Sequence, residues 1–243
     1  MLRRDLSTHY KSILVGAGAV AAIFTFLIVI IPSFSPDPEP LDEGFHTAGY
    51  LIAVFLGGLW FSSGIWSDVN STQQRQHFLT IPASSLEKYL SKWLITGPIF
   101  LIVATLGYYV FSILVNGFAS VFPGITYDGF SLFNEVNVGV MPYYLLIHPV
   151  FLAVGIWFER FAFIKGSLIQ IALQILYIGF IILLSTALFS SFESQVEQGL
   201  NIQIDNLEQM GLGKLESLNY VLGALTALFF GYLGYLRLTE RGA

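Results

Sequence analysis

The sequence lacks cysteine entirely, so the chain forms no disulfides and offers no thiolate metal site and no thiol nucleophile. Charge is also scarce. Asp, Glu, Lys and Arg make up 11% of the 243 residues, whereas soluble domains carry roughly 25%. Hydrophobic residues make up 55% of the chain, and the mean hydropathy is +0.70. This composition indicates an integral membrane protein.

Motifs for nucleotide binding and for metal-dependent hydrolysis are absent as well. No G-x-x-x-x-G-K-[ST] stretch occurs, so we expect the chain not to bind ATP. No H-E-x-x-H occurs either, and the four histidines are scattered along the chain: His9, His46, His77 and His148. We therefore expect no catalytic residue, metal ligand or cofactor. An intramembrane enzyme stays open as the less favoured alternative, because folding can bring distant residues together.

Long apolar runs are abundant. A bilayer core of ~30 Å is crossed by about 20 helical residues, and six windows reach that length. They are 13–31, 47–66, 93–115, 138–158, 167–189 and 218–236. Backbone exposed to lipid must satisfy its own hydrogen bonds, so each window is predicted to be a helix. The predicted fold is one all-α integral membrane domain, 1–243, with six transmembrane helices.

Basic residues lie almost entirely on one side of the predicted membrane. With six spans, both termini share a side with loops 67–92 and 159–166, and that side holds every Lys and Arg except Lys214. Cytoplasmic loops carry such an excess, so we place the termini and loop 67–92 in the cytoplasm and the protein in the cell (inner) membrane. The outer segment 190–217 is expected to form one or two short amphipathic helices with breaks at Gly199, Gly211 and Gly213.

Loop 67–92 contains a clear helix start. Pro82 disfavours helical angles at the preceding residue, and Ser84 with Glu87 three residues later fits a capping box. The helix is predicted to continue into the third span, with Lys88 and Lys92 pointing away from an apolar face. That face comprises Leu86, Tyr89, Leu90 and Trp93. The residues alone leave open whether this loop is a plain connector or a functional element.

Residues 77–94, HFLTIPASSLEKYLSKWL, resemble the cytoplasmic loop of permease subunits of ABC exporters of the ABC-2 type. The family pattern L-x-L-P-[AV]-S-x-x-E is matched by Leu79, Ile81, Pro82, Ala83, Ser84 and Glu87. The predicted layout is similar too: six spans, a cytoplasmic amphipathic N-terminus, and a long outer segment between spans five and six. The resemblance implies a cytoplasmic coupling helix between spans two and three.

The resemblance implies a permease that forms the substrate path while ATP is bound and hydrolysed by separate ATPase subunits. The implied partners are those ABC ATPase subunits, a second permease copy or homologue in a dimer, and the lipid bilayer, with no nucleic acid. Residues expected to couple to the ATPase are Arg75, His77, Phe78, Pro82, Ser84, Glu87 and Lys88. The substrate is not implied. A non-transporting membrane anchor or assembly subunit is the alternative.

Polar residues inside spans suggest a transport path. The candidates are His148, Gln170 and Gln174. His148 precedes Pro149, which leaves a backbone carbonyl of its helix without a donor. His148 could line the path or could bond that carbonyl, and the second interpretation is favoured because neutral polar groups often join neighbouring helices. In the second span, Gly57 and Gly58 would permit a neighbouring helix to approach closely.

Overall fold

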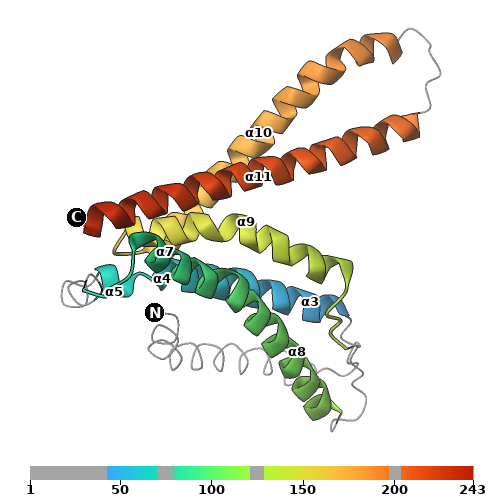
Figure 1. Ribbon diagram of the computed structural model, residues 1–243. Helices are drawn as coiled ribbons and strands as arrows, with labels where there is room; N and C mark the ends of the chain where they lie inside the picture. Colours follow the sequence, from blue (N-terminus) through green and yellow to red (C-terminus); the bar gives the residue numbers. More distant parts are fainter. Residues whose placement is uncertain (1–42, 71–77, 79, 121–128, 197–203, 243) are drawn as a thin grey trace.

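The computed structural model describes residues 43–70, 78, 80–120, 129–196 and 204–242, and every regular element within these ranges is a helix (Figure 1). In chain order they are α3 (Glu43–Ile52), the π-helical turn η2 (Ala53–Gly57), α4 (Gly58–Gly64), α5 (Ser67–Asn70), α7 (Ser85–Leu94), the π-helical turn η3 (Ile95–Ile99), α8 (Phe100–Ala119), α9 (Glu135–Trp157), α10 (Ala162–Val196) and α11 (Ile204–Gly242).

Five helical stretches are long and apolar enough to cross a membrane. They are His46–Gly64, Ser85–Phe118, Glu135–Trp157, Ala162–Leu184 and Leu218–Arg241. These stretches confirm the all-helical fold class and five of the six predicted windows, and they make the chain a multi-pass membrane protein. The first window, 13–31, lies outside the described residues, so the sixth span and the position of the N-terminus stay predictions.

The third predicted span is the continuation of α7. The segments α7, η3 and α8 follow one another without interruption, as the sequence predicted. Pro98 lies inside η3, where the wider π-turn accommodates a residue that has no backbone N–H to donate. The stretch Ser85–Phe118 has 34 residues. At about 1.5 Å per residue it is ~51 Å long, so part of it extends beyond a hydrocarbon core of ~30 Å.

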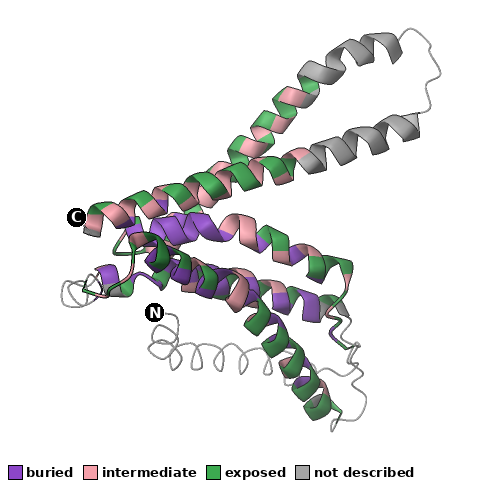
Figure 2. Ribbon diagram, viewed as in Figure 1, coloured by how far each residue is buried: buried purple, intermediate pink, exposed green. Residues whose placement is uncertain are grey.

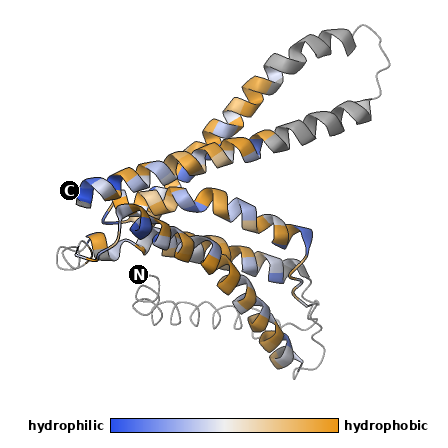
Figure 3. Ribbon diagram, in the orientation of Figure 1, coloured by the Kyte–Doolittle hydropathy of each residue, from blue (hydrophilic) through white to orange (hydrophobic). Residues whose placement is uncertain are grey.

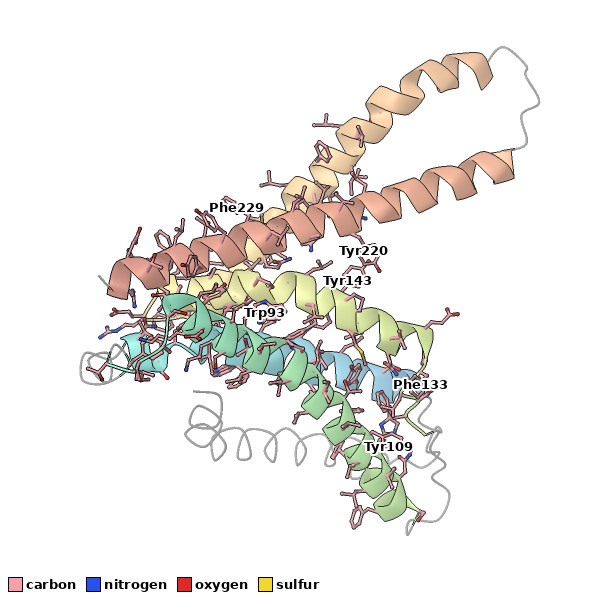
Figure 4. The ribbon with its side chains drawn as sticks, in the orientation of Figure 1. Trp93, Tyr109, Phe133, Tyr143, Tyr220 and Phe229 are labelled. Atoms are coloured by element: carbon pink, nitrogen blue, oxygen red, sulfur yellow. The ribbon has the colours of Figure 1, made fainter. Side chains whose placement is uncertain are left out.

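Helix α9 is the centre of the described bundle. It runs between α4 and α7 on one side and α11 on the other (Figure 1), and every residue from His148 to Ile156 is buried (Figure 2). A helix that is apolar on all sides is suited to such a position. Farther along, Tyr143 of α9 and Tyr220 of α11 lie near one another (Figure 4), with ring centroids 5.4 Å apart.

One end of the bundle has a core of its own. Its buried residues come from the turn after α4, from four helices (α5, α7, α9 and α11) and from Phe78: Ile65, Trp66, Val69, Phe78, Tyr89, Leu152, Ile156 and Leu238. The coloured parts of α8, α10 and α11 are mostly hydrophobic, whereas hydrophilic residues gather where α11 ends (Figure 3), and many large apolar side chains of these helices are exposed. Exposed apolar helix surfaces are what a lipid environment requires.

Helices α10 and α11 are longer than the sequence suggested, with 35 and 39 residues. Helix α11 continues through Gly211 and Gly213, so the predicted breaks at these two glycines are wrong, while Gly199 lies outside the described residues. A glycine inside a helix costs only about 1 kcal/mol relative to alanine, which is too little to end a long helix by itself. The two helices diverge in Figure 1, and they meet where the Tyr177 hydroxyl contacts that of Thr226.

Candidate functional site

The candidate site lies at the end of the bundle where three chain segments meet. The indole N–H of Trp66 donates to the Leu152 carbonyl oxygen at 2.9 Å, which joins the end of the second span to α9. Arg241, near the C-terminus, donates to the Asn70 side-chain oxygen at 2.5 Å, and the Asn70 amide donates to the Gly155 carbonyl oxygen at 3.1 Å. The structure thus brings α5, α9 and the C-terminal end of α11 together. That this end faces the cytoplasm is a prediction from charge.

The capping box at the start of α7 is confirmed. Ser84 has extended backbone angles, and its hydroxyl oxygen accepts from the Glu87 backbone N–H at 3.2 Å. The Ser84 backbone N–H in turn donates to the Glu87 carboxylate at 2.8 Å. Pro82, Ser84 and Glu87 are all exposed. The cap is therefore local, and it fixes where α7 begins.

We predict that Ser84→Ala loosens the first turn of α7. Loss of an N-cap side chain costs about 1 kcal/mol, which corresponds to about fivefold faster local opening. Hydrogen exchange of amides in the first turn of α7, followed by mass spectrometry on the protein in detergent micelles, measures this opening. Ser84→Thr retains an accepting oxygen and should exchange like the wild type, as should Ser85→Ala. Equal exchange in all three variants would show that the cap does not hold the turn.

The apolar face predicted for α7 does not coincide with its buried side. Lys88 and Lys92 are buried, with 6% and 0% of their surface exposed, whereas Leu86 and Leu90 are 50% and 45% exposed. Tyr89, which belongs to the same predicted face as these leucines, is buried. Because lipid is as apolar as leucine, hydrophobicity does not by itself turn a leucine toward the interior of a membrane protein.

Phe78 lies beneath α7 and accounts for the buried cations. Its side chain is fully buried, and the Lys88 and Lys92 ammonium nitrogens lie 5.2 and 6.0 Å from its ring centroid. An ammonium over an aromatic face is attracted by the ring electrons, and the lysine stems are themselves apolar. Phe78 and Lys88, expected to couple to a partner, therefore lie on the inner side of α7. Arg75 and His77 lie outside the described residues.

Tyr89 connects α7 to α11 and to the end of the second span through aromatic contacts. Its ring stacks on Trp66 with centroids 5.9 Å apart and meets Tyr235 of α11 edge-on at 6.3 Å. A Cβ added at Gly234 would lie 3.0 Å from the Tyr89 hydroxyl oxygen, so α11 approaches α7 closely where it has no side chain. A displacement of α7 would therefore be transmitted to α11 and to the end of the second span.

A buried polar cluster joins three spans just below α7. The Thr96 hydroxyl oxygen lies 2.9 Å from His148 Nε2, and the Tyr144 hydroxyl donates to the Thr96 carbonyl oxygen at 2.5 Å. Ser62 of α4 lies 3.4 Å from the Tyr144 hydroxyl and donates to Gly58 at 2.7 Å. The cluster thus links the second span, the third span and α9.

The hydrogen bonds of this cluster determine the tautomer of His148. Thr96 donates its hydroxyl hydrogen to the Lys92 carbonyl oxygen at 2.9 Å, so its oxygen accepts from His148 Nε2–H. His148 Nδ1 then carries a lone pair, and it is buried without a hydrogen-bond partner among the described residues. The favoured expectation that His148 bonds the carbonyl freed by Pro149 is wrong, because the imidazole donates to another span instead.

The three residues predicted to line a path differ in burial. His148 is fully buried, Gln170 is half-buried and Gln174 is exposed on α10. Among the described residues no hydrogen bond joins any two of them, so their role in a path stays a prediction. Within the same ranges no group of three His, Asp or Glu side chains could hold a metal ion.

Sequence reasoning missed most of the residues that hold this end together. Thr96 and Tyr144 act through partners far away in the sequence, which no local pattern reveals. Tyr144 and His148 are one turn apart on α9, with ring centroids 5.7 Å apart, and that spacing alone was a usable signal.

No protein-family model, curated protein or solved structure matches this chain, so the resemblance to the ABC-2 permeases rests on residues 77–94 and on the layout of the spans.

Proposed function

We propose that this chain is the membrane-spanning permease subunit of an ATP-driven exporter, and that α7 is the element that a separate ATPase subunit contacts. The observation that carries the proposal is the orientation of α7. Its lysines are buried, while Leu86 and Leu90 are about half exposed at the end of the bundle predicted to face the cytoplasm. A helix that keeps leucines on its outer face is suited to insertion into a groove of a partner.

The length of the helix supports contact with a partner outside the membrane. The 34-residue stretch from Ser85 is longer than the about 20 residues that a bilayer needs, so part of it extends past the hydrocarbon core. In the proposed arrangement this part includes the first turns of α7. On this model Leu86 and Leu90 contact the ATPase, together with the exposed Pro82, Ser84 and Glu87. Phe78 and Lys88 support α7 from beneath and do not touch the partner.

The contacts of α7 provide a route for movement. Because α7, η3 and α8 form one continuous rod, a push on α7 moves the third span with it. Tyr89 carries the push to α11 and to Trp66, and the bond between Thr96 and His148 carries it to α9. ATP hydrolysis on the partner would thereby shift the equilibrium between two arrangements of the spans in a permease dimer.

A second candidate is a non-transporting anchor or assembly subunit. The observation that favours it is the length of α10 and α11, which have 35 and 39 residues. Both exceed the about 20 residues required to cross the hydrocarbon core, so both extend beyond it and offer surface to a partner on the far side. An anchor of this kind would have no need of an ATPase.

The test is purification of the tagged chain from the membranes of its source, with mass spectrometry of the proteins that accompany it. We expect an ATPase with a G-x-x-x-x-G-K-[ST] motif, whose ATP hydrolysis rate changes when the permease is present. The double variant Leu86→Glu, Leu90→Glu should lower recovery of that ATPase at least about tenfold, since buried anchors carry most interface energy.

The matched control is Phe161→Asn. Phe161 is exposed at the same end with φ 56°, a backbone conformation that asparagine tolerates. We expect this variant to retain the ATPase, because it removes an exposed apolar side chain away from α7. The proposal fails if no such ATPase accompanies the folded wild-type chain, or if both variants retain it equally. Recovery of a partner without ATPase activity would favour the anchor.

A further inference from the structure

An apolar cavity lies between three helices at the same end of the bundle. It has a volume of about 240 Å³ and is lined by side chains of α9, α10, α11 and the residue that follows α9. These include Val154, Trp157, Phe158, Ile169, Phe230 and Leu233. Every one of these side chains is aliphatic or aromatic. Such a lining accepts a hydrocarbon chain and offers almost nothing to a polar solute.

Two cations stand at the mouth of this cavity. The Arg237 guanidinium lies 4.8 Å from the ring centroid of Trp157, and the Lys165 ammonium lies 4.2 Å from that of Phe158. Both rings line the cavity. Each cation is four residues from a lining residue of its own helix, so both lie about 6 Å nearer the end of the bundle where α10 begins and α11 ends.

The nearby carboxylates do not fully neutralise the two cations, so the mouth of the cavity stays positively charged. Glu240 pairs with one Arg237 nitrogen at 2.7 Å, while the Arg237 Nε is buried and donates no hydrogen bond to the residues that the structure describes. Glu159 lies 4.0 Å from Arg241. Lys165 forms no salt bridge with any carboxylate in the part of the chain that the structure describes. An anion at Lys165 would therefore meet no competing salt bridge among the described residues, and an anion at Arg237 would compete with Glu240.

We propose that this cavity binds an anionic phospholipid of the adjacent leaflet, with one acyl chain between α9, α10 and α11 and the phosphate at Lys165 and Arg237. The combination of a dry apolar slot with two cations at one rim matches a molecule that has a hydrocarbon tail and an anionic head. A free phosphate would leave the slot unused, and a zwitterionic lipid would gain less from the cations. The site does not depend on whether the chain is a transporter.

The head-group arm of the test uses the full chain in detergent micelles, titrated with dioleoyl phosphatidylglycerol or dioleoyl phosphatidylcholine and followed by native mass spectrometry. We expect the wild type to retain phosphatidylglycerol preferentially. Each cation near an anionic head is worth about 1 kcal/mol, so Lys165→Gln with Arg237→Gln should lower that affinity about thirtyfold and leave phosphatidylcholine unchanged. Arg160→Gln, which removes an exposed cation from the same end, should retain the preference.

The acyl-chain arm fills the cavity. Leu233→Trp should lower phosphatidylglycerol binding, whereas Leu228→Trp, on the exposed face of the same helix, should not. Circular dichroism and gel filtration establish that each variant is folded. If Leu233→Trp does not fold, the wild type is titrated instead with phosphatidylglycerols of increasing chain length, and affinity should rise with length.

Three results would overturn the proposal. Equal retention of both lipids would show that the cavity holds no head-group-specific site. Displacement of the lipid by inorganic phosphate, with no effect of Leu233→Trp or of chain length, would indicate a simple anion site. Loss of lipid in the Arg160→Gln control to the same extent as in the double variant would indicate attraction by overall charge. Retention of phosphatidylglycerol that requires both the cations and the open cavity would support the site.

Discussion

Replacement of Trp66 by alanine is expected to lower the free energy of unfolding by about 3–5 kcal/mol, the largest effect of any single substitution proposed for this protein. The Trp66 side chain is 0% exposed, stacks on Tyr89 and donates a hydrogen bond to the Leu152 carbonyl oxygen. Alanine would leave a cavity among the second span, α7 and α9, and neighbouring groups cannot collapse into it without separating those helices.

Trp60 provides the matched control. It lies in the same span, is 68% exposed and stacks on Phe163 with centroids 5.7 Å apart. Trp60→Ala should lower the free energy of unfolding by no more than about 1 kcal/mol, because lipid or detergent can fill the space of the exposed ring. Unfolding by SDS in mixed micelles, followed by circular dichroism, measures both variants without relying on tryptophan fluorescence. A cost for Trp60→Ala as large as that for Trp66→Ala would contradict the described packing.

Gly155→Ala is the second substitution with a large expected effect. A Cβ at this position would collide with the backbone carbonyl oxygen of Ser63 in α4. Backbone cannot rotate away as a side chain can, so α4 and α9 would have to separate. We expect a loss of about 1–3 kcal/mol in the free energy of unfolding. The separation of the helices would also weaken the hydrogen bond from the Asn70 amide to the Gly155 carbonyl oxygen.

Gly139→Ala in the same helix should behave in the opposite way. Among the described residues no neighbouring atom lies within 4 Å of a Cβ added there, so the substitution keeps the packing and gains about 0.5–1 kcal/mol from the better helix propensity of alanine. The same SDS titration compares the two variants. If Gly155→Ala were as stable as Gly139→Ala, the close crossing of α4 and α9 would be wrong.

Trp66 and Gly155 both lie at the end of the bundle that carries α7, and this position bears on the proposed function. A partner can move spans through α7 only if the contacts behind α7 resist deformation. Trp66, Tyr89 and Gly155 supply that resistance through stacking, a close helix crossing and bonds to backbone carbonyls. We therefore expect Trp66→Ala to weaken coupling to a partner as well as stability.

The sequence by itself determined the features that depend on neighbouring residues. The apolar windows predicted five spans that the structure contains, because a run of about 20 apolar residues is a local property. Ser84 and Glu87 marked the start of α7, because a capping box joins residues three apart. The resemblance in residues 77–94 likewise depends on a continuous stretch.

Only the tertiary structure decided which side of each helix faces inward. Lys88 and Lys92 turned out to be buried over Phe78, and His148 donates to Thr96, 52 residues away. Gly57 and Gly58 are alike in the sequence, yet a Cβ at Gly58 would lie 2.5 Å from Phe100, while one at Gly57 meets no atom within 4 Å in the described part of the chain. The reason is physical. Lipid is as apolar as the protein interior, so hydrophobicity predicts that a helix spans the membrane but does not predict its inward face, which contacts between distant segments determine.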